Sequence, residues 1–194
     1  MAKVAIFASG SGTNAEAIMR AAQSNVLDAE VALIVTDKPK AKVIERAHAF
    51  DVPCFIADPK TYETKACFEQ AIIDELGKRE VTFVVLAGYM RLVGPTLLSA
   101  YEGRIVNIHP SLLPSFPGLD AIGQAFKAKV KVTGVTIHYV DAGMDTGEII
   151  AQEPVRINED DTVDSLQKKV QEVEHKLYPE TIQTIIDRTK EVSN

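Results

Sequence analysis

The sequence predicts an α/β protein of three layers, in which a mostly parallel, twisted sheet has helices on both faces and antiparallel strands toward its C-terminal end. Three observations lead to this prediction. Short apolar runs alternate with longer amphipathic segments in the first half of the chain, which is typical of a parallel sheet covered by helices. A glycine-rich turn joins the first apolar run to the first amphipathic segment. Near the other end, two strand-like runs are joined by a glycine-containing loop, which indicates an antiparallel pair.

The first half of the chain supplies the parallel part of the sheet. Residues 3–8 are an apolar, β-rich run typical of a buried parallel strand. The glycine-rich turn at 9–14 follows, and a helix is expected at about 15–23. The remaining elements of this half alternate in the same way, with strands expected at 31–36, 53–56 and 82–87 and helices at 41–50 and 61–77.

The pattern changes after a short strand at residues 105–106. The segment 109–118 contains Pro110, Pro114 and Pro117 and cannot form a regular element. The elements expected beyond it are a short helix at about 121–127, strands at 134–140 and 148–156, and a last helix at about 163–188 with Asp160, Asp161 and Thr162 available to cap it.

Length and charge restrict the class of protein. The 194 residues are enough for one domain with one substantial core, so we expect a single domain over residues 1–194. Acidic residues outnumber basic ones by 27 to 21, for a net charge of −6, which argues against a general nucleic-acid binder. Small anionic ligands stay compatible with this charge, because a few backbone N–H groups can bind a phosphate on an acidic protein.

Cysteine use and hydropathy indicate the compartment. Cys54 and Cys67 have no metal-ligand spacing, and we expect both to be reduced. No run approaches the ~18 apolar residues that indicate a membrane span. The N-terminal MAKVAIFASG has no signal-peptide cleavage pattern. We therefore expect a cytoplasmic protein without a membrane partner, and no group of side chains indicates a metal site.

The glycine-rich turn, SGSGTN, is a candidate anion site. Gly10 and Gly12 let the backbone approach a ligand closely, and the N-terminus of the following helix favours a negative charge. A dinucleotide-binding fingerprint would need a third glycine where Ala15 stands, and a lone GxG is a weak signal. A site for a single phosphate is the first interpretation, a purely structural turn the second and a dinucleotide site the third.

Asn107 and His109 are the main candidates for catalysis. Two residues apart in an extended chain, they point to the same side, and they lie where a strand ends. Ligands bind at the carboxyl ends of strands in open α/β sheets. The proline-rich loop that follows is stiff enough to hold catalytic side chains to fine tolerances. The sequence leaves open whether its Leu113-Pro114 bond is cis.

Two aspartates compete as the partner of this pair. Asp141 and Asp145 both lie in the DAGMDTGEI turn, where an aspartate is also favoured for ordinary backbone hydrogen bonding. Spacing alone does not choose between them. Of the other histidines, His48 is expected in solvent on a charged helix, His138 either in the core or in the site, and His175 on the last helix.

Four segments together carry a family resemblance: FASGSGTN, LAGYMRLVGP, NIHPSLLPSFPG and VTIHYVDAGMDTGEIIAQ. They resemble the phosphoribosylglycinamide formyltransferase family, the folate-dependent transformylases of purine synthesis, over nearly the whole chain. NIHPSLLP with a downstream D-x-G is specific to the folate formyltransferase and hydrolase superfamily, and the form HPSLLPxFPG is specific to the glycinamide branch. The resemblance implies a Rossmann-like formyltransferase fold, with residues 1–100 as the nucleotide-phosphate-binding half and 101–194 as the catalytic and folate-binding half.

The resemblance also implies a role for particular positions. The catalytic trio falls on Asn107, His109 and Asp145, which selects Asp145 over Asp141. The remaining matches are Gly12, Thr13 and Asn14 for the nucleotide phosphate, Glu174 for the ribose hydroxyls, Met90, Arg91, Leu92 and Val93 (together with Asn107) for the folate pteridine, and Lys65 for the folate tail. Two stretches depart from the family. Glu148 stands where several relatives have proline, and LDAIG, residues 119–123, follows FPG where a histidine is common.

The reaction implied is attack by the amine of glycinamide ribonucleotide on the formyl carbon of 10-formyltetrahydrofolate, a co-substrate, with no tightly bound cofactor. Asn107 and a protonated His109 would stabilise the negative formyl oxygen, and Asp145 would stabilise the imidazolium and hold a water that relays the proton. Ser111 is then structural. The partners are the two small-molecule substrates, without nucleic acid, and the protein is a monomer or a homodimer.

Three rival functions are compatible with parts of the pattern. A formyltetrahydrofolate deformylase would use the same trio with water as the acceptor, but that family carries an additional N-terminal domain. Methionyl-tRNA formyltransferases carry a C-terminal β-barrel, which the sequence does not predict. A non-catalytic nucleotide- or folate-binding module would need the loops and no trio.

Overall fold

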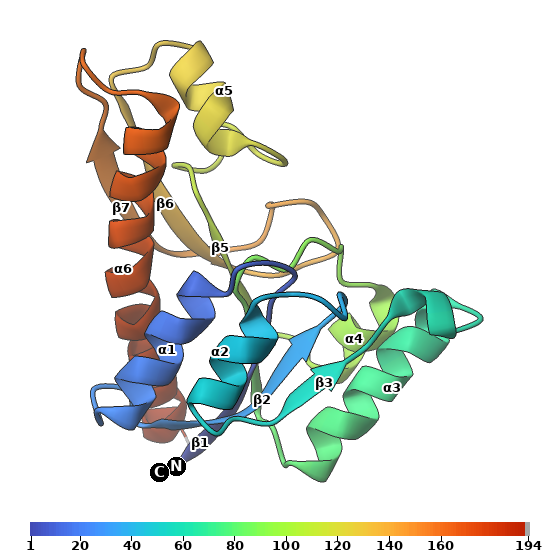
Figure 1. Cartoon of the computed structure of the whole chain (residues 1–194). Coiled ribbons are helices and arrows are strands. Elements are labelled where there is room, and N and C mark those ends of the chain that lie inside the picture. The colour runs from blue at the N-terminus through green and yellow to red at the C-terminus, as the bar shows by residue number, and fades with distance from the viewer. Residues whose placement is uncertain (193–194) are drawn as a thin grey trace.

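The computed structural model describes residues 1–192, and its sheet has the strand order β3-β2-β1-β4-β5-β6-β7 (Figure 1). The first five strands in this order are parallel, and β6 and β7 run antiparallel to their neighbours. The strands are β1 (Ala2–Phe7), β2 (Ala29–Thr36), β3 (Cys54–Ile56), β4 (Phe83–Leu86), β5 (Ile105–His109), β6 (Val132–Tyr139) and β7 (Ile149–Arg156). This arrangement confirms the predicted fold class.

Helices cover both faces of the sheet. On one face lie α1 (Thr13–Gln23), α2 (Val43–Ala49), α5 (Ala121–Lys127) and α6 (Val163–Val192). On the other lie α3 (Lys65–Lys78) and α4 (Pro95–Ala100), and a 3-10 turn at Pro59–Thr61 precedes α3. Figure 1 shows α6, in orange and red, as the longest helix, and it packs along α1. None of the helices in this described part combines the length and the apolar character needed to cross a membrane.

The apolar alternation of the strands explains why both faces are covered. In β1, Val4 and Ile6 pack under the α1–α6 layer, whereas Ala5 and Phe7 pack under α3 and α4. All four are fully buried. A strand that buries both faces reads as a continuous apolar run, which is the pattern of β1 in the sequence.

The chain reverses its direction across the sheet between β1 and β4. From β1 it proceeds outward through β2 to β3, then returns through α3 to β4 on the other side of β1. Such a switch point leaves a crevice at the carboxyl ends of the two central strands. The loop after β1 and the segment after β4 therefore lie side by side, and Ser9 N–H donates to Gly88 O at 3.0 Å.

Among the differences from the sequence-based expectation, two concern elements beside the site. Helix α4 is absent from that expectation, because its six residues are too few to show a helical period. Strand β5 continues to His109, three residues beyond the expected strand, because Val106–His109 pair with β6. Asn107 and His109 thus lie within the last residues of a strand, which fixes their directions more firmly than a loop would.

Candidate active site

A cavity of about 570 Å³ opens at the carboxyl ends of β1, β4 and β5. It collects segments that are far apart in the sequence, namely the loop after β1, the segment after β4, the end of β5, the turn between β6 and β7, and one face of α6. Its lining includes all the predicted site residues except Lys65: Gly12, Thr13, Asn14, Met90, Arg91, Leu92, Val93, Asn107, His109, Asp145 and Glu174.

The glycine loop presents the N-terminus of α1 to this cavity. Gly12 is the N-cap residue with a φ of 72°, and no side chain caps the helix, so the first N–H groups of α1 have no helical partner. The loop is fixed from outside by α2, where Val43 N–H donates to Gly10 O and Arg46 Nε donates to Ser11 O at 2.7 Å. Arg46 is itself paired with Glu16. An uncapped, rigid helix N-terminus favours an anion.

A buried carboxylate faces this loop from α6. Glu174 is 8% exposed, and its Oε2 accepts a hydrogen bond from Asn14 Nδ2 at 3.0 Å. The pKa of Glu174 is raised, because the effect of burial is only partly offset by the hydrogen bond from Asn14. Asn14 Oδ1 is buried without a protein partner in the described chain. A ligand with hydroxyl groups would supply hydrogen-bond donors to Asn14 Oδ1 and to the Glu174 carboxylate.

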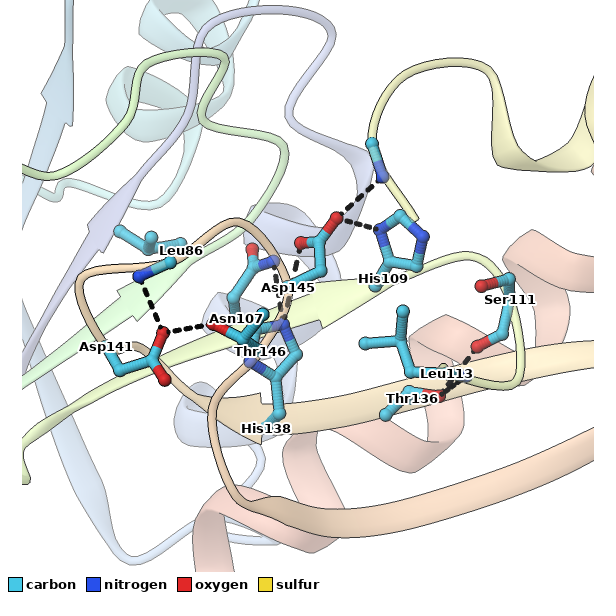
Figure 2. A network of polar contacts seen from close by, with 12 residues as sticks. Leu86, Asn107, His109, Ser111, Leu113, Thr136, His138, Asp141, Asp145 and Thr146 are labelled. Carbon is cyan, nitrogen blue, oxygen red and sulfur yellow. Dashed lines mark hydrogen bonds and ion pairs between the residues drawn. The ribbon is translucent and has the colours of Figure 1, made fainter. Parts of the chain in front are cut away.

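His109, at the end of β5, and Asp145, in the turn between β6 and β7, point toward each other (Figure 2). His109 Nδ1 lies 3.5 Å from Asp145 Oδ2, and both side chains are largely buried. The other ring nitrogen, Nε2, lies 2.9 Å from the carbonyl oxygen of Phe116. Nε2 faces an acceptor and Nδ1 faces a carboxylate, so each nitrogen lies where an N–H can donate. The distance of 3.5 Å to Asp145 is long for a hydrogen bond, so Nδ1–H can also donate to a ligand oxygen in the cavity.

Asn107 is oriented by His138, its partner in the β5–β6 register. Asn107 Nδ2 lies 3.3 Å from His138 Nε2, and His138 Nδ1 lies 2.8 Å from Tyr139 O. A histidine that donates from Nδ1 accepts at Nε2, so the amide nitrogen of Asn107 is the end that points to it. The second N–H of that amide is left for a ligand. The structure thus answers the open question about His138, which is both buried and part of the site.

The structure separates the two aspartates of the β6–β7 turn. Asp141 Oδ1 accepts hydrogen bonds from Gly143 N–H at 2.9 Å and Thr146 Oγ1 at 2.7 Å, so it folds the turn. The hydrogen bond from Thr146 is the main reason that the pKa of Asp141 is lowered. Asp145, held at a φ of 55°, points toward the two histidines, and its Oδ2 accepts from Gly118 N–H at 2.8 Å. This geometry favours Asp145 as the partner of His109.

The proline-rich loop is held by a buried hydroxyl on β6. Thr136 Oγ1 donates to Ser111 O at 2.6 Å and accepts from Leu113 N–H at 3.0 Å (Figure 2). The Leu113-Pro114 bond is cis. Ser111 is fully buried, and its Oγ donates to Ser115 O at 2.6 Å. Ser111 is therefore committed to the loop, in agreement with its predicted structural role.

The segment after β4 forms one wall of the cavity. Met90 and Leu92 expose 64% and 59% of their surface there, which is unusual for large apolar side chains and suits contact with a flat apolar ligand. Lys65 lies outside the lining, on the first turn of α3, where its Cε packs beside Gly94 at the end of the segment.

Sequence reasoning did not include the amide side chains of α6. Gln167 and Gln171 line the cavity together with Glu174, because residues spaced by four and three fall on one face of a helix. That spacing was visible in the sequence once Glu174 had been placed. Within residues 1–192, no three His, Cys, Asp or Glu side chains are grouped as metal ligands. Cys54 and Cys67 are both free.

Comparisons with known proteins find similarity over nearly the whole chain. The family described as formyl transferase matches residues 2–182. The chain is 58% identical to phosphoribosylglycinamide formyltransferase of Bacillus subtilis, with 96% of this chain and 95% of that protein covered. It also superposes on the crystal structure of phosphoribosylglycinamide formyltransferase from Bacillus halodurans with a TM-score of 0.93 and 61% identity, covering 96% of each chain. Glycinamide ribonucleotide transformylase 1 from Geobacillus kaustophilus gives a TM-score of 0.93 at 57% identity, covering 95% of this chain and 98% of that one.

Proposed function

The chain belongs to the formyl transferase family, and we propose on this basis that it transfers the formyl group of 10-formyltetrahydrofolate to the amine of N1-(5-phosphoribosyl)glycinamide (glycinamide ribonucleotide). The products are the N-formyl nucleotide and tetrahydrofolate, and the reaction belongs to purine (IMP) biosynthesis. A deformylase is not favoured, because the relatives of high identity over nearly the whole chain are named as transferases.

In the proposed reaction, the amine nitrogen forms a bond to the formyl carbon, and the formyl oxygen becomes negative. The bond between that carbon and N10 of the folate then breaks, and one proton moves from the attacking amine to the leaving nitrogen. Hydrogen-bond donors placed where the negative charge develops lower the barrier of such a step. A group that carries the proton lowers it further.

The site residues take the following roles in this proposal. The free N–H of Asn107 and the Nδ1–H of His109 donate to the formyl oxygen, since His138 and Phe116 occupy the other donors of these side chains. Asp145 stabilises the charged imidazole and can hold the water that relays the proton. The N-terminus of α1 binds the phosphate, Glu174 and Asn14 bind the ribose hydroxyls, and segment 90–93 with Lys65 binds the folate.

The observation that carries the proposal is the composition of one cavity. An anion site, a buried acceptor for hydroxyl groups, two donors beside a carboxylate and an exposed apolar wall all line it. Each part matches one portion of the two substrates. A nucleotide- or folate-binding module without activity would need no donor pair beside Asp145.

One assay separates the candidate functions. Protein is mixed with 10-formyltetrahydrofolate, and the folate absorbance is followed with and without glycinamide ribonucleotide. Turnover that requires the nucleotide supports the transferase. Turnover without the nucleotide would instead identify a deformylase, and the absence of turnover under both conditions would identify a binding module.

The remaining expectations belong to the same proposal. 10-Formyltetrahydrofolate acts as a co-substrate and leaves as tetrahydrofolate, so no tightly bound cofactor is required. The expected partners are these small molecules, in a cytoplasmic monomer or homodimer. The division into a phosphate-binding half at 1–100 and a catalytic half at 101–194 is approximate, because the folate segment 90–93 comes from the first half. Gel filtration tests the oligomeric state.

A further inference from the structure

Two buried carboxylates stand outside the cavity and have no part in the mechanism above. Asp37 follows β2 and is 7% exposed, and Glu69 lies on α3 and is 2% exposed. Neither lines the cavity. Carboxylates are seldom buried in this way unless they are paired or hydrogen-bonded. Both of them hold segment 88–94, the wall that follows β4.

Asp37 holds the beginning of this segment through Ser9. Ser9 Oγ donates to Asp37 Oδ1 at 2.5 Å, and the same Oγ accepts from Met90 N–H at 2.9 Å. Since a hydroxyl has one proton, its donation to Asp37 fixes its lone pairs toward Met90. Ser9 N–H also donates to Gly88 O at 3.0 Å, so Ser9 contacts the segment twice. Ser9 is 2% exposed and does not line the cavity.

Glu69 holds the end of the segment directly. Its Oε1 accepts from Gly94 N–H at 2.5 Å, and its Oε2 accepts from Leu97 N–H at 3.1 Å. These groups belong to the N-terminus of α4, where Gly94 is the N-cap residue and no side chain of the helix itself provides a cap. A Cβ on Gly94 would lie 2.6 Å from Glu69 Oε1, so the carboxylate fits closely against the backbone.

The middle of the segment is left free for a ligand. Within residues 1–192, the backbone N–H groups of Arg91, Leu92 and Val93 make no hydrogen bond to the protein. The guanidinium of Arg91 lies 5.4 Å from the ring centre of Phe68, the neighbour of Glu69 on α3. The segment is therefore fixed at both ends and unpaired between them.

We propose that Ser9 with Asp37, and Glu69, are positioning residues that hold the folate-binding segment at its two ends, so that its free backbone groups are already in place when folate binds. This inference rests on the proposed function. A segment that is ordered before binding loses less conformational freedom on binding, and the gain appears as affinity. None of these side chains needs to touch either substrate. Their loss should weaken folate binding and spare nucleotide binding.

The test uses the full chain and three variants. Tetrahydrofolate binding is measured by titration calorimetry under argon, and KM is measured for each substrate. Ser9→Ala removes the acceptor of Met90 N–H, and Glu69→Gln replaces one of two carboxylate acceptors by an amide donor. We expect each to raise the Kd for tetrahydrofolate roughly fivefold, as for the loss of one hydrogen bond, with the nucleotide KM within about twofold. Asp37→Asn keeps an acceptor for Ser9 and should stay within about twofold of wild type.

Tyr101→Phe is the matched control. It removes one buried hydroxyl that donates to Val81 O, at the opposite end of α4 from Gly94 and away from the cavity. This variant should bind tetrahydrofolate as wild type does, even if its Tm falls as far as that of Glu69→Gln. A fall in folate and nucleotide affinity by the same factor would show a general structural role and overturn the inference. Unchanged folate affinity in Ser9→Ala and Glu69→Gln would also overturn it.

The wild-type protein separates this test from that of the proposed function. Absence of nucleotide-dependent turnover in wild type would contradict the function, whereas an active wild type with insensitive variants would contradict only the positioning role. Circular dichroism establishes that each variant folds. If Glu69→Gln does not fold, Ser9→Ala decides the question alone, because it removes a single oxygen.

Discussion

The two ends of the cavity present their functional atoms in different ways. At the phosphate end, the loop after β1 offers backbone N–H groups, and the conformation of the loop depends on Gly12 and on the hydrogen bonds that α2 makes to it. At the catalytic end, Asn107, His109 and Asp145 offer side-chain atoms, each oriented by a named neighbour. The first end is built from backbone shape and the second from side-chain chemistry.

This difference has consequences for substitutions. At the catalytic end, replacing one side chain removes a reacting group, so the rate of the chemical step should fall. At the phosphate end, most replacements leave the N–H groups in place, so only those that deform the backbone or remove a hydrogen bond to the ligand should matter. Their effect should appear in KM and in stability.

The largest expected effect belongs to the catalytic side chains. His109→Ala, Asn107→Ala and Asp145→Ala should each lower kcat by on the order of 10²-fold or more, which is typical of lost oxyanion or acid–base groups. The KM for the nucleotide should change little. Steady-state kinetics with folding checked by circular dichroism measures both. Near-normal turnover by folded His109→Ala protein would remove His109 from the mechanism.

A backbone effect should dominate at the phosphate end. Gly12→Ala would place a Cβ 2.6 Å from Cγ2 of Val43 and 3.0 Å from its Cα, at a residue with a φ of 72°. We expect a loss of about 2 kcal/mol in the free energy of unfolding, and an increased nucleotide KM. Urea denaturation measures the first quantity.

Gly10→Ala is the matched control for that change in stability. A Cβ at Gly10 meets no atom within 4 Å. Its stability should be equal to that of wild type or slightly higher, since alanine restricts the unfolded chain. Equal losses in the two variants would mean that the loop does not depend on the conformation of Gly12.

Asn14→Ala tests the side-chain contribution at the same end. The variant loses the donor to Glu174 and an oxygen without a protein partner. The nucleotide KM should rise about tenfold, the usual cost of a hydrogen bond to a charged group, and kcat should stay within about twofold. A kcat that falls while KM stays constant would place Asn14 in the chemical step instead.

The smallest effect concerns stability and pH. Burial raises the pKa of Glu174, so the folded protein holds this proton more tightly than the unfolded chain does. Stability is therefore lost as pH rises from the unfolded pKa through the folded one. Glu174→Gln cannot ionise at this position, so its Tm relative to that of wild type should be higher at pH 8 than at pH 4. If the difference in Tm between Glu174→Gln and wild type stays constant over this range, the ionisation of Glu174 does not contribute to the pH dependence of stability.

The contrast between the two ends also explains what the sequence could predict. The alternating apolar runs were sufficient to predict the layered sheet, and the glycines of SGSGTN were sufficient to predict a loop at a helix N-terminus. Both features depend on local sequence pattern. The choice between Asp141 and Asp145 depends on how the turn folds over His109, with Asp145 at a positive φ, and local spacing carries no such information. The role of His138 depends on the β5–β6 register, which pairs it with Asn107. The site roles remain proposals that the kinetics above would test.

The hydrogen bond between Asn14 and Glu174 joins residues that are 160 positions apart. The stretch of chain between them contains every strand from β2 to β7, so the contact can exist only after the sheet has assembled and α6 has docked on α1. A nucleotide that binds there binds only the fully folded protein and not partly folded forms. The bound substrate would then link the first and last helices noncovalently. Enzyme saturated with substrate should therefore be cleaved more slowly by proteases that act on partly unfolded forms.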